Sequence, residues 1–318
     1  MLFQFAYVIA GLVLLLWSGD LLVRGVVGLA TALKIPALLI SLTVVAFGTS
    51  APELIVSVQA VLAGSEGIAI GNIIGSNIAN IFLVLGVPAL IYPIKTNVIG
   101  LRRHGVVMLV ASAAFAGAAY VHGAIDTIVG IALILGVVLY VTYLWIHALR
   151  SPDADPMLEE VEEHEPDKKV SLKTIGLIFA GLIGMPVGAH LLVSNGSIIA
   201  SGLGVRDEVI GLTIIAFGTS LPELATVVAA AIRKNSDVAI GSIIGSCTFN
   251  IFVVGGAVGL VGTAYFDSAA LRLDIPVMLL GAVTLSLYVF TRKTIGKVSG
   301  LLMTAVYVGY IYMLAISI

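Results

Sequence analysis

Long apolar stretches of about 18 or more residues recur along the whole chain, separated by short polar segments. Each stretch suits a helix that crosses the hydrocarbon core of a bilayer, which takes about 20 apolar residues. A transmembrane β-barrel would instead show short segments of alternating polarity, and the sequence has none. The pattern therefore predicts an all-α protein embedded in the lipid bilayer, with ten transmembrane helices. We expect them near residues 3–23, 37–62, 68–92, 104–121, 126–147, 174–196, 207–231, 238–262, 273–291 and 298–317.

The composition excludes several classes of protein. Only 11% of the residues are charged and the mean hydropathy is +1.14, whereas a soluble domain has about 25% charged residues. The formal charge of −2 offers no basic face for a nucleic acid. Because Cys247 is the single cysteine, an internal disulfide and a cysteine-built metal site are excluded. We expect neither an enzyme nor a bound cofactor.

The distribution of basic residues predicts the orientation in the membrane. The first apolar stretch has no basic leading segment and no cleavage site of small residues, so we expect it to be retained as a helix. If the N-terminus is outside, 14 of the 16 Lys and Arg residues lie on one side, and only Arg206 and Arg272 on the other. Because basic residues favour the cytoplasmic side, we predict a multi-pass protein of the cell inner (plasma) membrane with both termini extracytoplasmic.

Residues 149–173 form an acidic connection on the predicted cytoplasmic side. They hold eight of the 18 acidic residues, together with three prolines. Such a segment cannot bury enough apolar surface to fold by itself, so it favours a solvated linker. A calcium-sensing loop is the less favoured alternative, because nothing in the segment has the spacing of an EF-hand.

An internal repeat divides the chain into two halves, 1–148 and 174–318. A shift of 170 residues aligns 43–86 with 213–256 without a gap, and 23 of the 44 positions are identical. Shared apolar character alone would not keep Thr, Ser, Glu and Asn in register. The chain is therefore predicted to duplicate a five-helix unit. Because five is odd, the second copy would enter the membrane from the opposite side, giving the inverted repeats that are common in secondary transporters.

Both copies of the repeat contain the string Ala-Phe-Gly-Thr-Ser-x-Pro-Glu, at 46–53 and 216–223. Pro52 has no N–H to give to the carbonyl of Gly48, so the helix should break or kink there. Freed carbonyl oxygens are costly at membrane depth unless something binds them, and a cation would do so. We therefore predict interrupted helices at the midplane of the membrane.

Two carboxylates, Glu53 and Glu223, fall well inside the predicted hydrocarbon region. No Lys, Arg or His lies within the spans of the repeat to neutralise them, so a proton or a metal cation must do so. The next helix adds Gly-x-Ile-Ile-Gly-Ser at 71–76 and 241–246, whose glycines allow close helix packing, followed by an asparagine in each copy. Such an all-oxygen set suits Ca²⁺, with Na⁺ as a competitor.

These motifs resemble those of the cation/calcium exchanger superfamily, and most specifically of its prokaryotic sodium/calcium exchanger branch. The resemblance implies a secondary active antiporter that exchanges about three Na⁺ for one Ca²⁺ by alternating access. The first and sixth spans would slide past the other helices. The implied metal site consists of Glu53, Glu223, Thr49, Thr219, Ser50, Ser220, Ser76, Ser246, Asn80, Asn250 and the carbonyl groups of Ala46 and Ala216. The two copies of the repeat complete this site within one chain, so a monomer suffices.

The chain departs from the family pattern at three places. Asn250 stands where some members have Asp, which weakens the case for potassium co-transport. Cys247 replaces the Asn77 of the first copy, and we expect it to serve packing. Asp20 and His190 occupy equivalent positions, for which we favour a role at a helix end over proton coupling.

The sequence is also compatible with other functions. An H⁺/Ca²⁺ antiporter is the main alternative, since protons also neutralise carboxylates, although the string Gly-Asn-x-x-Glu-His that is typical of the proton-coupled branch is absent. A cation channel could use the same oxygens as a filter but does not need two inverted copies. An intramembrane protease is less favoured, because its catalytic pair would not need Thr, Ser and Asn in both copies.

Overall fold

The computed structural model describes residues 2–33, 35–150, 170–203, 216–268 and 270–316. This part of the chain is helical except for two strands, β1 (Ala124–Ile125) and β2 (Ala264–Tyr265). The two strands pair in antiparallel fashion and so join the two halves at one end of the molecule. Several helices contain π-helical segments, which are labelled η.

The helices of the two halves have the following bounds. The first half contains α1 (Leu2–Leu33), α2 (Ala37–Ile40), η1 (Ser41–Val45), α3 (Ala46–Thr49), α4 (Ala51–Leu62), α5 (Glu66–Ala79), η2 (Asn80–Val84), α6 (Gly86–Ile91), α7 (Leu101–Gly117), η3 (Ala118–His122) and α8 (Thr127–Arg150). The second half contains α10 (Leu172–Gly202), α12 (Ala216–Gly218), α13 (Leu221–Ile232), α14 (Ser236–Phe249), η5 (Asn250–Val254), α15 (Gly255–Val261), η6 (Ala270–Asp274), α16 (Ile275–Thr291) and α17 (Lys297–Ile316).

Within the described ranges, eight helices are long and apolar enough to cross a membrane, and they overlap eight of the predicted spans. A ninth candidate is the pair Ala37–Thr49 and Ala51–Leu62, whose two parts meet at 41°. The predicted span 207–231 falls partly on 204–215, outside the described residues, and its described helix Leu221–Ile232 is short. The all-helical membrane fold is therefore confirmed, whereas the count of ten remains a prediction.

The first span is longer than predicted. The apolar pattern predicts an end near residue 23, just before Arg24, but α1 continues to Leu33. Asp20 lies one turn before Arg24, and the two side chains form an ion pair at 2.8 Å. The helix therefore continues past a charge that is neutralised on its own surface.

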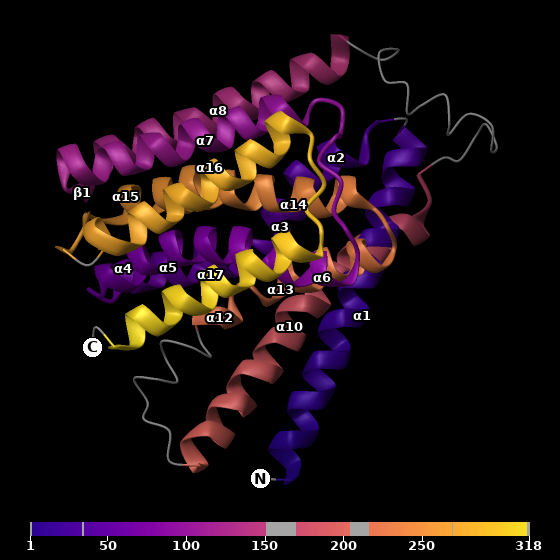
Figure 1. The fold of residues 1–318 in the computed structure, drawn as a ribbon, viewed down its shortest axis with the longest axis horizontal. Helices are drawn as coiled ribbons and strands as arrows, with labels where there is room; N and C mark the ends of the chain where they lie inside the picture. The colour runs from indigo at the N-terminus through magenta and orange to yellow at the C-terminus, as the bar shows by residue number, and fades with distance from the viewer. Residues whose placement is uncertain (1, 34, 151–169, 204–215, 269, 317–318) are drawn as a thin grey trace.

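Helices α1 and α10 lie side by side and run steeply across the direction of the other helices (Figure 1). Glycines allow their backbones to meet. A Cβ atom at Gly188 would lie 2.8 Å from the backbone nitrogen of Leu15, and one at Gly11 equally close to that of Leu192. This close packing makes α1 and α10 a compact pair beside the remaining helices.

The repeated helices fold alike in both halves. Helices α5 and α14 each have 14 residues, and each is followed by a π-helical segment that starts at the repeated asparagine, Asn80 or Asn250. The glycine notch predicted on α14 is present, because a Cβ at Gly245 would lie 2.7 Å from the Cβ of Ala46. For Gly75, its counterpart on α5, nothing described lies within 4 Å. The equivalent partner segment falls largely on 204–215, so the first notch stays a prediction.

Candidate cation-binding site

The helix break predicted from the proline is present in both halves. Ser50 ends the helical geometry of α3 with φ −87° and ψ 5°, and Ser220 has almost the same angles, −85° and 2°. Helices α4 and α13 begin at the next residue, with a proline in the first turn. Glu53 and Glu223 therefore stand in the first turn of their helices, where the helix dipole favours negative charge.

The break of the first half faces the carboxylate of the second half. The hydroxyl of Ser50 donates a hydrogen bond to Oε1 of Glu223 at 3.1 Å. The hydroxyls of Thr49 and Ser246 lie 3.4 Å apart, and both also approach the Glu223 carboxyl group. Four of the predicted residues, from three helices and both halves, thus meet around one carboxylate.

The two carboxylates are fully buried and poorly satisfied. Glu53 and Glu223 are both 0% exposed, and they lie close enough to repel each other electrostatically. Neither carboxylate oxygen of Glu53, nor Oε2 of Glu223, has a hydrogen-bond partner among the described residues. The same holds for the side-chain oxygens of Asn80 and Asn250, which are also 0% exposed. Because buried polar atoms are nearly always paired, these carboxylate and amide oxygens are candidates to bind a proton or a cation.

The other predicted residues lie on the same elements. Ser220 is buried, and its hydroxyl has no hydrogen-bond partner among the described residues. Ser76 is buried on α5 and Thr219 is half-buried at the second break. The carbonyl of Ala46 accepts the N–H of Ser50 at 3.1 Å and, at 3.5 Å, the hydroxyl of Thr49. Ala216 begins α12.

Among the described residues, two carboxylates supply the negative charge of the site. Within the described part of the chain, no three His, Cys, Asp or Glu side chains gather closely enough to hold a metal ion. The remaining oxygens belong to hydroxyl, amide and backbone groups, which are neutral. Such a set can bind hard cations with a site charge of −2, and it lacks the sulfur and imidazole ligands that transition metals prefer.

One residue beside the site was missed from the sequence. The amide of Asn72 on α5 donates to the backbone oxygen of Glu53 at 3.0 Å and to the hydroxyl of Ser57 at 2.8 Å. It therefore ties the first carboxylate-bearing helix to the next helix. Asn72 is not one of the identical positions of the repeat, because the second copy has Ser242 there.

The structure locates two of the residues at which the chain departs from the family pattern, Asp20 and Cys247. Asp20 was expected near a helix end, which is wrong, because it lies well inside α1 and forms ion pairs with Arg24 and Arg233. Its side chain keeps its charge inside a predicted span because two guanidinium groups neutralise it. Cys247 is buried in the core and also lies beside Asn80 and Glu223, so its assignment to packing stays a prediction.

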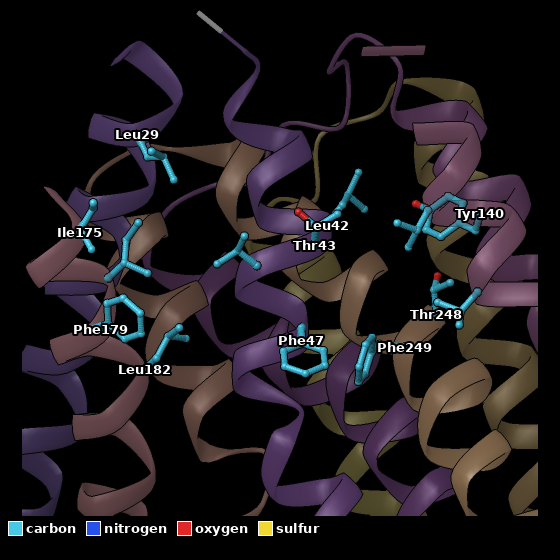
Figure 2. Close-up of a pocket in the computed structure, with 14 residues that line it drawn as sticks. Leu29, Leu42, Thr43, Phe47, Tyr140, Ile175, Phe179, Leu182, Thr248 and Phe249 are labelled. Atoms are coloured by element: carbon cyan, nitrogen blue, oxygen red, sulfur yellow. The ribbon is translucent and has the colours of Figure 1, made fainter. Parts of the chain in front are cut away.

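The structure also contains a cavity of about 590 Å³, whose lining side chains are drawn in Figure 2. It lies among α1, η1, α3, α8, α10 and α14 and is lined almost entirely by apolar side chains. Phe47 and Phe249 contribute to its lining and pack edge to face, with ring centroids 5.0 Å apart. None of the predicted site residues lines it, so this cavity is not the cation site.

Known proteins are similar to this chain over nearly its whole length. The family model described as "Sodium/calcium exchanger protein" matches residues 3–147 and 173–316, nearly the whole chain. The chain belongs to the sodium/calcium exchanger protein family. The match leaves out the acidic connection and covers both halves of the repeat.

Relatives of this exchanger family match over almost their full length. The chain is 36% identical to the putative antiporter CaxA of Alkalimonas amylolytica, covering 99% of both chains. It is 30% identical to the sodium/calcium exchanger MaX1 of Methanosarcina acetivorans, covering 98% of both. A solved structure of the sodium-calcium exchanger NCX_Mj is 32% identical, covers 97% of both chains and superposes with a TM-score of 0.83. These relatives are named as exchangers or antiporters, and none carries the name of an enzyme.

Proposed function

We propose that this protein is a secondary active antiporter that exchanges Na⁺ for Ca²⁺ by alternating access. The observation that carries the proposal is the pair Glu53 and Glu223. These two fully buried carboxylates come from opposite halves and leave three oxygens without partners in the described structure. The names of MaX1 and NCX_Mj point to the same ions. The ligands are the residues predicted from the sequence, with Thr49, Ser50 and Ser246 gathered around Glu223.

Charge balance supports exchange over leak. Deprotonated, the two carboxylates carry −2, and desolvating such charges costs several kcal/mol per ion. An empty, occluded and deprotonated site is therefore rarely populated, which prevents the protein from changing sides without cargo. One Ca²⁺ or two Na⁺ bring the site to zero, and a third Na⁺ leaves +1. We propose a stoichiometry of about three Na⁺ to one Ca²⁺, so that each cycle moves one net charge.

The proposed architecture is ten transmembrane helices in two inverted five-helix repeats, 1–148 and 174–318, joined by the acidic linker 149–173. It is supported by the repeat of sequence, by the matching breaks at Ser50 and Ser220, and by the π-helical segments that start at Asn80 and Asn250. The bias of basic residues supports extracytoplasmic termini and a cytoplasmic linker in the inner membrane. A single chain supplies the whole site.

The test is uptake of ⁴⁵Ca²⁺ into proteoliposomes loaded with Na⁺, K⁺ or acidic buffer, with all other conditions equal. The proposal expects uptake to require internal Na⁺ and to stop when the Na⁺ gradient is removed. Uptake driven equally well by a proton gradient alone would replace it with an H⁺/Ca²⁺ antiporter. Uptake without any counter-ion gradient would indicate a channel.

A further inference from the structure

A cluster of three charged side chains joins α1 to α13 outside the cation site. Asp20, near the middle of α1, forms an ion pair with Arg24 one turn later at 2.8 Å. Its other carboxylate oxygen forms an ion pair with the guanidinium of Arg233, the residue that ends α13. Asp20 and Arg233 are about one-third exposed, so solvent screens this pair only in part.

The cluster joins α1, which is one helix of the compact α1–α10 pair, to α13, which is one of the helices around the cation site. Helix α1 packs tightly against α10 through glycines along its length. Helix α13 carries Glu223 in its first turn and Arg233 at its other end. The Asp20–Arg233 ion pair therefore connects the α1–α10 pair directly to the helix that carries one of the two carboxylates.

The repeat shows what stands at the mirrored end of the molecule. The shift of 170 residues also aligns α1 with α10, where Leu21, Leu22 and Val23 match residues 191–193 identically. At that shift, none of the three positions of the cluster keeps its carboxylate or guanidinium group. Asp20, Arg24 and Arg233 correspond to His190, Ser194 and Ala63.

The mirrored residues cannot form the same connection. His190 and Ser194 lie one turn apart on α10, with their side-chain nitrogen and oxygen 3.5 Å apart. Ala63, which follows α4, offers only an exposed methyl group. Two exact inverted repeats would give two conformations of equal free energy, one open to each side of the membrane. A connection present in one copy alone removes that equality.

We propose that the Asp20–Arg233 ion pair, which we call the strap, stabilises the conformation of this structure. The strap thereby disfavours the second conformation of the transport cycle, in which the site opens to the opposite side of the membrane. The inference rests on the proposed alternating access. It assigns to these two residues control of the conformational equilibrium, not of ion binding. Because the strap touches neither carboxylate, its loss changes the populations of the states and leaves the cation ligands in place.

The experiment measures these populations with spin labels on the full-length protein. In a Cys247→Ser background, labels at Thr31→Cys on α1 and Ile232→Cys on α13 occupy exposed positions that lie outside the ion pair. Pulsed electron paramagnetic resonance then gives the distribution of distances between the two labels, in Na⁺ and in Ca²⁺. We expect Asp20→Asn and Arg233→Gln each to shift the ratio of the two states by about tenfold, which corresponds to about 1.4 kcal/mol.

Two further variants separate the strap from simple damage to the fold. If the two residues act as one pair, the double variant shifts the ratio no more than either single variant does. Arg24→Gln is the matched control, because the ion pair that Arg24 forms among the described residues is with Asp20 on its own helix. Grafting the charges onto the mirrored end, with His190→Asp and Ala63→Arg, is expected to shift the ratio in the opposite direction.

The outcomes distinguish this inference from the proposed function. If Asp20→Asn leaves the distance distributions unchanged and retains Na⁺-driven ⁴⁵Ca²⁺ uptake, the proposed strap is wrong and the proposed antiporter still stands. A wild-type protein without Na⁺-driven uptake overturns the antiporter instead. A single distance that does not respond to Na⁺ or Ca²⁺ in any variant also overturns the strap.

Discussion

At the scale of single residues, the chemistry depends on two carboxylates that the fold leaves unsatisfied. Glu53 and Glu223 are fully buried, and three of their four oxygens have no partner within the described chain. Each charge destabilises the ion-free protein and is stabilised when a cation binds. Binding and stability are therefore linked at these two positions.

Replacing either glutamate by glutamine should separate these two effects. Glu53→Gln and Glu223→Gln are each expected to reduce Na⁺-driven ⁴⁵Ca²⁺ uptake to the level of empty liposomes, because half of the site charge is lost. The ion-free melting temperature should rise, since a buried charge is removed, while the stabilisation of the wild type by Ca²⁺ should disappear. A variant that keeps uptake would remove that glutamate from the site.

Asn72 offers a milder test of how the first carboxylate is positioned. Asn72→Ser installs the residue of the second copy and removes two hydrogen bonds, to the Glu53 carbonyl and to Ser57. At about 1 kcal/mol for each bond, the KM for Ca²⁺ should rise by roughly five- to thirtyfold, with the maximal rate less affected. Ser242→Ala is the control, because Ser242 bonds only to a carbonyl of its own helix among the described contacts. Equal effects of both variants would contradict a positioning role for Asn72.

Residues that act through a repeated motif could be predicted from the sequence, and those that act through a single contact could not. Glu53 and Glu223 stood out because an acid in an apolar span is costly and both copies keep it. Asn72 and Arg233 have no counterpart of the same type in the other copy. Their roles depend on which helices pack together, and the sequence pattern does not state this.

At the scale of helices, the proline breaks and the spans followed from local chemistry, whereas packing partners did not. A missing N–H at Pro52 and Pro222 predicts a break wherever those residues fold into a helix. By contrast, the end of α1 was predicted too early, because the charge of Arg24 is neutralised by its neighbour Asp20. The π-helical segments at Asn80 and Asn250 leave no signal in hydropathy.

The α1–α10 contact makes a prediction about helix packing. A Cβ at Gly188 would meet the backbone of α1, 2.8 Å from the nitrogen of Leu15 and 2.9 Å from the oxygen of Gly11. Gly188→Ala should therefore push the helices apart and destabilise the protein by about 1–3 kcal/mol. Gly176→Ala on the same helix meets nothing within 4 Å of its Cβ among the described atoms and should be neutral or slightly stabilising. Thermal unfolding in detergent compares the two, and equal melting temperatures would contradict the close contact.

At the scale of the whole molecule, the two halves share one site. Ser50 from the first half bonds the carboxylate from the second, and Thr49 meets Ser246 across the same boundary. Neither half alone surrounds Glu223. A duplicated sequence predicts two similar units, but only the assembled chain shows that their breaks meet, because that contact joins residues 173 positions apart.

The proposed stoichiometry makes the complete transport cycle sensitive to voltage. When three Na⁺ leave a proteoliposome for each Ca²⁺ that enters, one net positive charge moves outward, so an inside-positive potential should favour Ca²⁺ uptake. One charge across 100 mV is worth about 2.3 kcal/mol, which shifts the Ca²⁺ accumulation ratio about fiftyfold at equilibrium. The potential can be set with K⁺ gradients and valinomycin while the Na⁺ gradient stays constant, and Glu53→Gln serves as the blank. Exchange of two Na⁺ for one Ca²⁺ would move no net charge, so accumulation that is independent of voltage would rule out the three-to-one cycle and leave the carboxylate site itself unchallenged.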